Sequence, residues 1–485
     1  MQNVSHNLNE TIWHQKRGLS TPLGPQTTGP VLSLRLSPDT RFFCRYETDK
    51  MALETLVARS VLTALLLMIG TMLLWPWMQA SVSDSTSVYL AVPSRGSSAS
   101  LPVHLGAQSG SGPVPFYMYD DPDITMAEVL SCPGFGASET ADVEFIKLMQ
   151  QHPWRVQDPE QARVHIIPTP LAASFTFGNK TCGGTHMGRV FRAFRRLLAH
   201  PVYRRHTLTH YLHCHYWQCF LGWGWPNERL FPDALFQEGN MANIMMGRYE
   251  RHYSTLSDCE LYGATFEICK HSHQLFHLEN TGLYHMRWEL SRCAIVVPYL
   301  ASRSLRVLRP SFEEWQQRNN TVFYHIKEGR FVWGATDIRR APINGSFSKL
   351  PGVEVGFTIP HKEWVSKLEQ SKFCLVSRGD TPSSHALYNA IKVGCVPVIV
   401  SDTFSLFGQP FSTQLPWSLF TITISEQTFL SDPLAVARVL WQMHVNQLRA
   451  LVLNVQRIAQ PALLYEPNGT LGAHVLRQLV EDCLN

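Results

Sequence analysis

A polar loop near residue 380 holds the side chains of this chain that are best suited to chemistry. An apolar run at 373–377, with the length of a buried strand, precedes the loop, and helical spacing from His385 to Val393 follows it. Gly394 stands where a helix commonly ends, and a second buried strand is expected at 396–401. Open α/β sheets bind ligands beyond the carboxyl ends of their strands, and a helix N-terminus there attracts phosphate. The loop residues expected to contact such a ligand are Arg378, Asp380, Thr381, Ser383 and Ser384.

The segment 371–402 resembles the donor-site signature of the exostosin family of glycosyltransferases. The resemblance is dense over this segment, weaker from Pro113 to Pro360 and absent before residue 113. It implies a Golgi enzyme with two Rossmann-like domains in the GT-B arrangement. It also implies a UDP-linked nucleotide sugar as co-substrate, a glycan or polysaccharide acceptor and a hetero-oligomer with a related transferase. It requires no metal ion or other cofactor.

Basic residues ahead of the signature complete the predicted donor site. In the family, a glycine-containing basic loop follows the strand that corresponds to 322–325 and leads to an arginine at the diphosphate. Lys327, Arg339 and Arg340 fill that description here. Arginine suits this role because its planar fork binds phosphate oxygens in pairs. A solvated basic loop is the alternative interpretation of each of these residues.

The chain departs from the family pattern inside the predicted helix. Family members commonly carry an arginine pair where this chain has His385-Ala386, and an acid where it has Asn389. Asn389 is still expected to contact donor hydroxyls, but it supplies no charge. Two functions therefore stay open. One is a lumenal glycosyltransferase that works with inversion, and the other is a catalytically silent family member that assembles with an active one.

Length and composition indicate a multidomain protein. The 485 residues exceed what one hydrophobic core usually holds, and 45% of them are hydrophobic against 16% charged. A net charge of +4 gives no support for nucleic-acid binding.

The N-terminal part has the layout of a type II membrane protein. Residues 1–59 are expected to form a disordered cytosolic tail, 60–78 a single transmembrane helix, and 79–112 a disordered serine-rich stem. A cleaved signal peptide and a buried core helix are the alternatives for 60–78. Basic residues gather before this segment and only Arg95 lies between it and residue 113, which places the N-terminus in the cytosol and the remainder in a lumen. The resemblance implies that this lumen is that of the Golgi.

The expected fold class is therefore α/β. Residues 113–310 are assigned to an N-terminal Rossmann-like acceptor domain, and 311–485 to a C-terminal Rossmann-like donor domain. Helical spacing at 432–459 predicts a segment that crosses back over the first domain.

Cysteines and glycosylation sequons fit an oxidising lumen. Ten of the eleven cysteines lie beyond residue 78, and we expect disulfides among them, with Cys259–Cys269 as the most local pair. Cys374 and Cys395, in or beside buried strands, are expected to stay reduced. The acceptor sequons of this part are at Asn179, Asn319, Asn344 and Asn468.

Three residues of the first domain are candidates for the catalytic base by location alone, namely Asp120, Asp121 and His210. Asp121-Pro-Asp123 also fits a metal-binding D-x-D pattern, although three acids after a first strand are common and a structural role is favoured. The histidine- and cysteine-rich segment 206–219 leaves a zinc site as the less favoured alternative.

Overall fold

The structure, a computed structural model, describes residues 112–131, 140–178, 182–214, 243–249, 293–326, 338–339, 345–357, 359–378 and 383–485. The predicted tail, transmembrane helix and stem lie outside these ranges, apart from Gly112. In the described ranges, no helix combines the length and the apolar character needed to cross a membrane. Every described residue belongs to one compact unit, Val88–Asn485.

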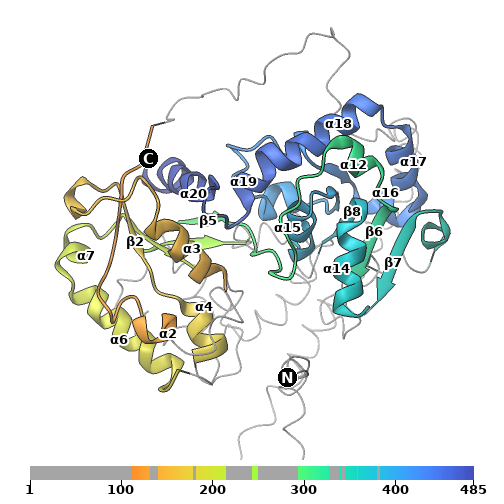
Figure 1. The fold of residues 1–485 in the computed structure, drawn as a ribbon. Helices are drawn as coiled ribbons and strands as arrows, with labels where there is room; N and C mark the ends of the chain where they lie inside the picture. The colour runs from red at the N-terminus through yellow and green to blue at the C-terminus, as the bar shows by residue number, and fades with distance from the viewer. Residues whose placement is uncertain are drawn as a thin grey trace, which may run out of the picture. The chain divides into compact units, whose positions relative to one another are not determined.

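The described strands form two five-stranded parallel sheets, so the α/β class is confirmed (Figure 1). In the first sheet the strands lie in chain order, without the reversal of a doubly wound sheet. Its strands are β1 (Phe116–Met118), β2 (Val164–Ile167), β3 (His210–His213), β4 (Met245–Arg248) and β5 (Ala294–Val296).

The second sheet has a reversal in its strand order. The order is β10-β9-β8-β6-β7, so the chain leaves β6 to one side and returns to its other side with β8. This is the flavodoxin-like order, whose ligand site lies at the carboxyl ends of the first and third strands. The strands are β6 (Asn320–Ile326), β7 (Val353–Phe357), β8 (Ser371–Ser377), β9 (Val396–Val400) and β10 (Ile422–Ile424).

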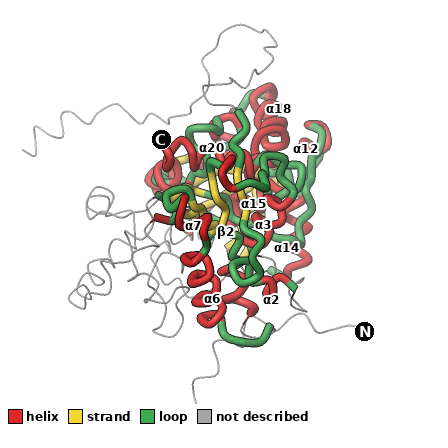
Figure 2. Tube along the Cα trace, turned by 90° about the vertical axis from the view of Figure 1, so that its left-hand side faces the viewer, coloured by secondary structure: helices red, strands yellow, loops and turns green. Residues whose placement is uncertain are grey.

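Helices surround the strands of both sheets (Figure 2). Those described before residue 300 are α2 (Ala127–Leu130), α3 (Ala141–Gln150), η2 (Pro159–Gln161), α4 (Leu171–Ala173), η3 (Ser174–Gly178), α6 (His186–Ala199) and α7 (Pro201–Arg205). Those around the second sheet are α12 (Phe312–Gln316), η7 (Ser346–Lys349), α14 (His361–Glu369), α15 (His385–Lys392), η8 (Phe404–Gly408), η9 (Trp417–Leu419) and α16 (Glu426–Ser431). The C-terminal helices are α17 (Leu434–Gln442), α18 (Val445–Asn454), η10 (Val455–Ala459), α19 (Gln460–Leu463), α20 (Leu471–Leu479) and η11 (Val480–Leu484).

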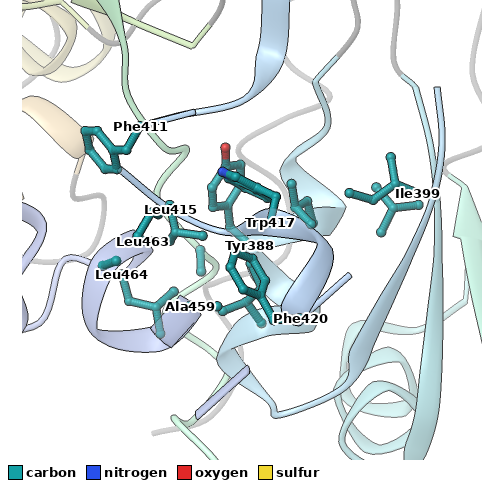
Figure 3. Close-up of a cluster of buried hydrophobic side chains, with 14 of the residues drawn as sticks. Tyr388, Ile399, Phe411, Leu415, Trp417, Phe420, Ala459, Leu463 and Leu464 are labelled. Atoms are coloured by element: carbon teal, nitrogen blue, oxygen red, sulfur yellow. The ribbon is translucent and has the colours of Figure 1, made fainter. Parts of the chain in front are cut away.

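The strand–loop–helix–strand unit predicted from the sequence is confirmed as β8, α15 and β9. Every residue of β9 is buried, as expected for a parallel strand covered on both faces. Gly394 has a φ of 65°, the left-handed conformation that ends a helix at low cost for glycine. Tyr388 of α15 belongs to a hydrophobic cluster with Trp417, Phe420 and residues of η10 and α19, so the helix is packed on both sides (Figure 3).

The prediction that Cys374 and Cys395 stay reduced is wrong. The two residues form a disulfide with Cα atoms 5.9 Å apart, because β8 and β9 are neighbours and place both cysteines near the same point of the sheet. The expected disulfide chemistry is thus confirmed, while Cys259 and Cys269 lie outside the described residues.

The prediction that residues 432–459 cross back over the first domain is also wrong. The helices of residues 432–459 contact η7, η9 and α12 beside the second sheet. It is α20 that packs on α3 and β5, where the Cys293–Cys483 disulfide ties the C-terminal end to the start of β5 (Figure 1). Helical spacing finds an apolar face, but the partner of that face depends on the tertiary fold.

Several buried histidines make stability sensitive to acid. Burial lowers the pKa of His165 to about 4, of His210 to about 2, of His213 to about 3 and of His474 to about 4. The unfolded chain, with ordinary histidine pKa values near 6.5, then binds more protons than the folded chain below that pH. The contribution of these neutral histidines to the free energy of unfolding is therefore fully present above pH 6.5 and is lost as the pH falls towards 4.

We predict a loss of about 1 kcal/mol per buried histidine between pH 6.5 and 5.5. Urea unfolding at both pH values measures it, and His474→Gln should remove one such contribution, whereas His361→Gln, at an exposed position, should not. If the free energy of unfolding depends on pH equally in wild type and His474→Gln, His474 does not contribute to the loss of stability in acid.

Candidate functional site

The carboxyl ends of β6 and β8 are joined by hydrogen bonds at the reversal point of the second sheet. The Tyr324 hydroxyl lies 2.8 Å from the Ser377 hydroxyl and also donates to the Arg339 carbonyl oxygen at 3.0 Å. Arg339 Nε in turn donates to the Arg378 carbonyl oxygen at 3.4 Å. The structure thus brings two predicted donor-binding arginines together where this strand order binds ligands.

Arg378 is the first residue after β8, and its side chain is almost fully buried. Arg378 Nε donates to both carboxylate oxygens of Glu426 at 3.0 Å, and each side chain is 7% exposed. Burial raises the pKa of the Glu426 carboxyl, and the Arg378 guanidinium opposes that shift. An ion pair that is so well buried holds Arg378 in one orientation.

The N-terminus of α15 is closed by its own side chains. The Ser384 hydroxyl accepts a hydrogen bond from Ala386 N at 3.3 Å and caps the helix. Ser383 is buried beneath η8, where a Cβ added to Gly408 would lie 3.0 Å from Ser383 Cβ. A side chain at position 408 would therefore crowd the contact between η8 and the loop. In this conformation, the Ser384 hydroxyl is engaged by the helix that it caps.

Asn389 is engaged by the chain itself. Its Oδ1 accepts from Ser302 N at 2.8 Å, and its Nδ2 lies 3.0 Å from His385 Nδ1. Lys392 Nζ donates to the Ser302 carbonyl oxygen at 3.1 Å, so α15 holds the segment that follows β5. Two of the three residues that depart from the family pattern, His385 and Asn389, therefore form one hydrogen-bonded pair. The predicted contact of Asn389 with donor hydroxyls stays a prediction.

Four of the predicted donor-binding residues lie outside the described residues, namely Lys327, Arg340, Asp380 and Thr381. Their roles stay predictions.

The acids after β1 lie at the carboxyl edge of the first sheet. Asp120 is exposed. Asp121 accepts hydrogen bonds from Asp123 N at 3.0 Å and from Arg196 Nε at 2.7 Å, which hold the pKa of its carboxyl below the usual value against the opposing effect of burial. Asp123 pairs with Arg192 at 3.1 Å. Both acids of the D-x-D pattern are thus bound by arginines of α6, as the structural interpretation expects.

His210 lies apart from these acids. It opens β3, at the amino end of the strand, and its ring is fully buried, with Nε2 2.6 Å from the Tyr119 hydroxyl. The His165 ring lies beside it, with ring centres 5.1 Å apart, and hydrogen-bonds Thr209 through Nδ1 at 2.8 Å. A ring packed in this way does not reach an acceptor sugar, so the geometry favours Asp120 among the three candidates for the base.

The described residues include no group of three or more His, Cys, Asp or Glu side chains placed to bind a metal ion. Within the segment that suggested zinc, Cys214 is disulfide-bonded and is not available as a thiolate ligand.

Sequence reasoning missed Glu426 and Asp402. Asp402 N donates to Glu426 Oε1 at 3.2 Å, and Glu426 N donates to Asp402 Oδ1 at 2.9 Å. Asp402 follows β9, which the sequence predicted, and Glu426 follows the short apolar strand β10. The position of each acid just after an apolar strand is a signal that could have found both.

Two buried polar atoms at this edge lack a partner in the described structure. Arg378 Nη1 and the Thr403 hydroxyl have no hydrogen bond, although neither is open to solvent. A buried donor without an acceptor costs about 1–3 kcal/mol, and more when it is charged. An arrangement that leaves such donors at the ligand-binding edge of a parallel sheet is suited to hydrogen-bonding a bound polar molecule.

Comparison with known proteins points to one family. Residues 295–440, which hold β5 to α17, match the model of the Exostosin GT47 domain. The chain is 38% identical over 71 residues to an Exostosin-1 homolog of Caenorhabditis elegans. The aligned segment makes up 15% of this chain and 18% of that protein. It is 30% identical over 118 residues to a protein named probable glucuronoxylan glucuronosyltransferase of Arabidopsis thaliana, which covers 24% of each chain.

The matches span about a fifth of the length of these relatives. Among solved structures, the chain is similar to the pneumococcal O-GlcNAc transferase GtfA in complex with UDP and GlcNAc. The identity is 11%, 63% of this chain and 62% of that chain are covered, and the TM-score of 0.27 is too low to support an argument. The match of residues 295–440 confirms the resemblance noted in the signature segment: this part of the chain is similar to the Exostosin GT47 domain and to relatives named exostosin and glucuronosyltransferase.

Proposed function

We propose that the protein transfers a sugar from a nucleotide-sugar donor, UDP-linked, to a glycan or polysaccharide acceptor. The observation that carries this proposal is the meeting of Arg339 and Arg378 at the β6/β8 reversal, inside the segment that matches the family. A nucleotide sugar has oxygen atoms that can accept hydrogen bonds from the unpaired donors at this edge, Arg378 Nη1 and the Thr403 hydroxyl. The proposal includes the GT-B arrangement, with the donor on the second sheet and the acceptor on the first.

The proposed transfer proceeds with inversion. A base removes the proton of the acceptor hydroxyl, the hydroxyl oxygen attacks the anomeric carbon, and the bond from that carbon to the diphosphate breaks. Asp120 is the proposed base because it is the exposed acid at the carboxyl edge of the first sheet. Arg339 would stabilise the negative charge that grows on the leaving diphosphate. No step of this scheme requires a metal ion.

The central test is donor turnover by the purified full-length chain. Arg339→Ala should reduce turnover of a UDP-sugar about 100-fold and weaken UDP binding much less, because the charge on the diphosphate grows only as the bond breaks. Arg438→Ala is the matched control, since Arg438 is exposed and pairs with Asp432 far along the chain from the loop. Hydrolysis of a panel of UDP-sugars, with UDP affinity measured beside it, provides both quantities.

A catalytically silent partner of an active transferase is the second candidate. The observation in its favour is the engagement of Asn389 and His385 with each other and with Ser302, in the place of the family's charged residues. The absence of both turnover and UDP binding in the wild-type chain would favour this candidate. The proposed hetero-oligomer with a related transferase fits either function.

We further propose that the protein is a single-pass type II protein of the Golgi membrane with a lumenal catalytic part. The Cys293–Cys483 and Cys374–Cys395 disulfides support an oxidising compartment. Asn319 and Asn468, two of the sequon residues, are exposed, whereas Asn179 and Asn344 lie outside the described residues.

Attached glycans test this location. Asn319→Gln and Asn468→Gln should each lower the apparent mass of the expressed protein by one glycan, and glycosidase treatment should abolish the difference from wild type. An unchanged mass after glycosidase treatment of the wild-type protein would contradict a lumenal location.

A further inference from the structure

The Arg378–Glu426 pair links the ends of two strands that are not neighbours. Arg378 follows β8 and Glu426 begins α16 after β10, with β9 between the two strands. The Arg378 side chain therefore extends away from the β6/β8 reversal and towards the outer edge of the sheet. Both side chains are more than nine-tenths buried, so water does not compete for their hydrogen bonds.

Glu426 is itself fixed from β9. Its carboxylate accepts from Arg378 Nε and from Asp402 N, and its backbone N–H donates to the Asp402 carboxylate. This reciprocal pair of bonds leaves the carboxylate little freedom to turn. The orientation of the Arg378 guanidinium is thus determined by Glu426, which follows β10, and by Asp402, which follows β9.

The pair leaves one oriented donor unused. Among the described residues, the buried Arg378 Nη1 has no hydrogen-bond partner, and the buried Thr403 hydroxyl, which follows β9, has none either. Glu426 already balances the charge of Arg378. A phosphate at Nη1 would therefore add a buried negative charge without a further cation from this pair, whereas an uncharged oxygen would complete the hydrogen bonds without that cost.

Burial also indicates which end of the donor binds here. The transferred sugar must stay open to the acceptor, while the nucleoside takes no part in the reaction and can leave water completely. A deeply buried N–H at this edge of the sheet suits the nucleoside.

On the basis of the proposed function, we propose that Glu426 is a positioning residue that orients Arg378 Nη1 towards an uncharged oxygen of the donor nucleoside, and that the diphosphate binds elsewhere at this edge. The acceptor is a base carbonyl or a ribose hydroxyl.

Binding of uridine, UMP, UDP and inorganic pyrophosphate to the full-length chain tests the proposal by calorimetry. Arg378→Lys and Glu426→Gln should weaken uridine, UMP and UDP by the same factor, tenfold or more, and should leave pyrophosphate binding unchanged. Comparison of uridine with 2′-deoxyuridine and 3′-deoxyuridine on wild type and Arg378→Lys separates a ribose hydroxyl from a base carbonyl. Glu313→Gln is the control, because Glu313 is an exposed partner of Arg449.

The other outcomes decide against the proposal. Arg378 would be a phosphate ligand if the variants bind uridine as the wild type does but bind pyrophosphate more weakly, and if the loss of affinity is larger for UDP than for UMP. Equal losses for pyrophosphate and uridine would show a general disruption of the site, and unchanged binding of all four ligands would show no role. If Glu426→Gln does not fold, Glu426→Asp, which withdraws the carboxylate by one methylene, replaces it. Failure of the wild type to bind any of the ligands would instead overturn the proposed function, and this inference with it.

Discussion

Parallel pairing of β6, β8 and β9 is the constraint on which the second half of the structure depends. Parallel neighbours need a crossing connection between them, so the residues that follow each strand gather at one edge. Because β9 and most of β8 are buried on both faces, helices must cover the sheet, and α15 is held between it and the C-terminal helices. The edge then collects Arg378, Asp402 and Glu426 without any of them being close in sequence. The gathering of these three side chains at one edge is therefore a consequence of strand order.

The same packing connects the site to the first sheet. Asn389 and Lys392, on one side of α15, hold Ser302 in the segment that follows β5. At the other end of the chain, Tyr465 donates to the Pro298 carbonyl oxygen at 2.9 Å, and its hydroxyl lies 3.1 Å from His213 Nε2 of β3. The Cys293–Cys483 disulfide adds a covalent link beside β5. Elements beside the second sheet and elements of the first sheet are thus joined both before and after β5 in the chain.

Local features of the sequence predicted the signature unit well, because short apolar runs and Gly394 specify β8, α15 and β9 without reference to the rest of the fold. The same reasoning failed wherever a partner lies far away in the sequence. The Cys374–Cys395 disulfide requires that β8 and β9 be neighbours in register, and the pairing of Glu426 with Arg378 requires the order β8-β9-β10. Asn389 accepts a hydrogen bond from Ser302, which lies 87 residues earlier, and no spacing in the sequence indicates that partner. The apolar face of residues 432–459 was evident, whereas the elements that it covers were not.

Amide hydrogen exchange of the full-length chain, with and without UDP, tests most directly whether the carboxyl edge of the second sheet is the donor site. Exchange reports the loss of local opening where a ligand binds. The account predicts that UDP slows exchange in the residues that follow β8, β9 and β10, within 383–393, 401–408 and 425–431. Slower exchange confined to the first sheet, or unchanged exchange at these segments while UDP is bound, would contradict it.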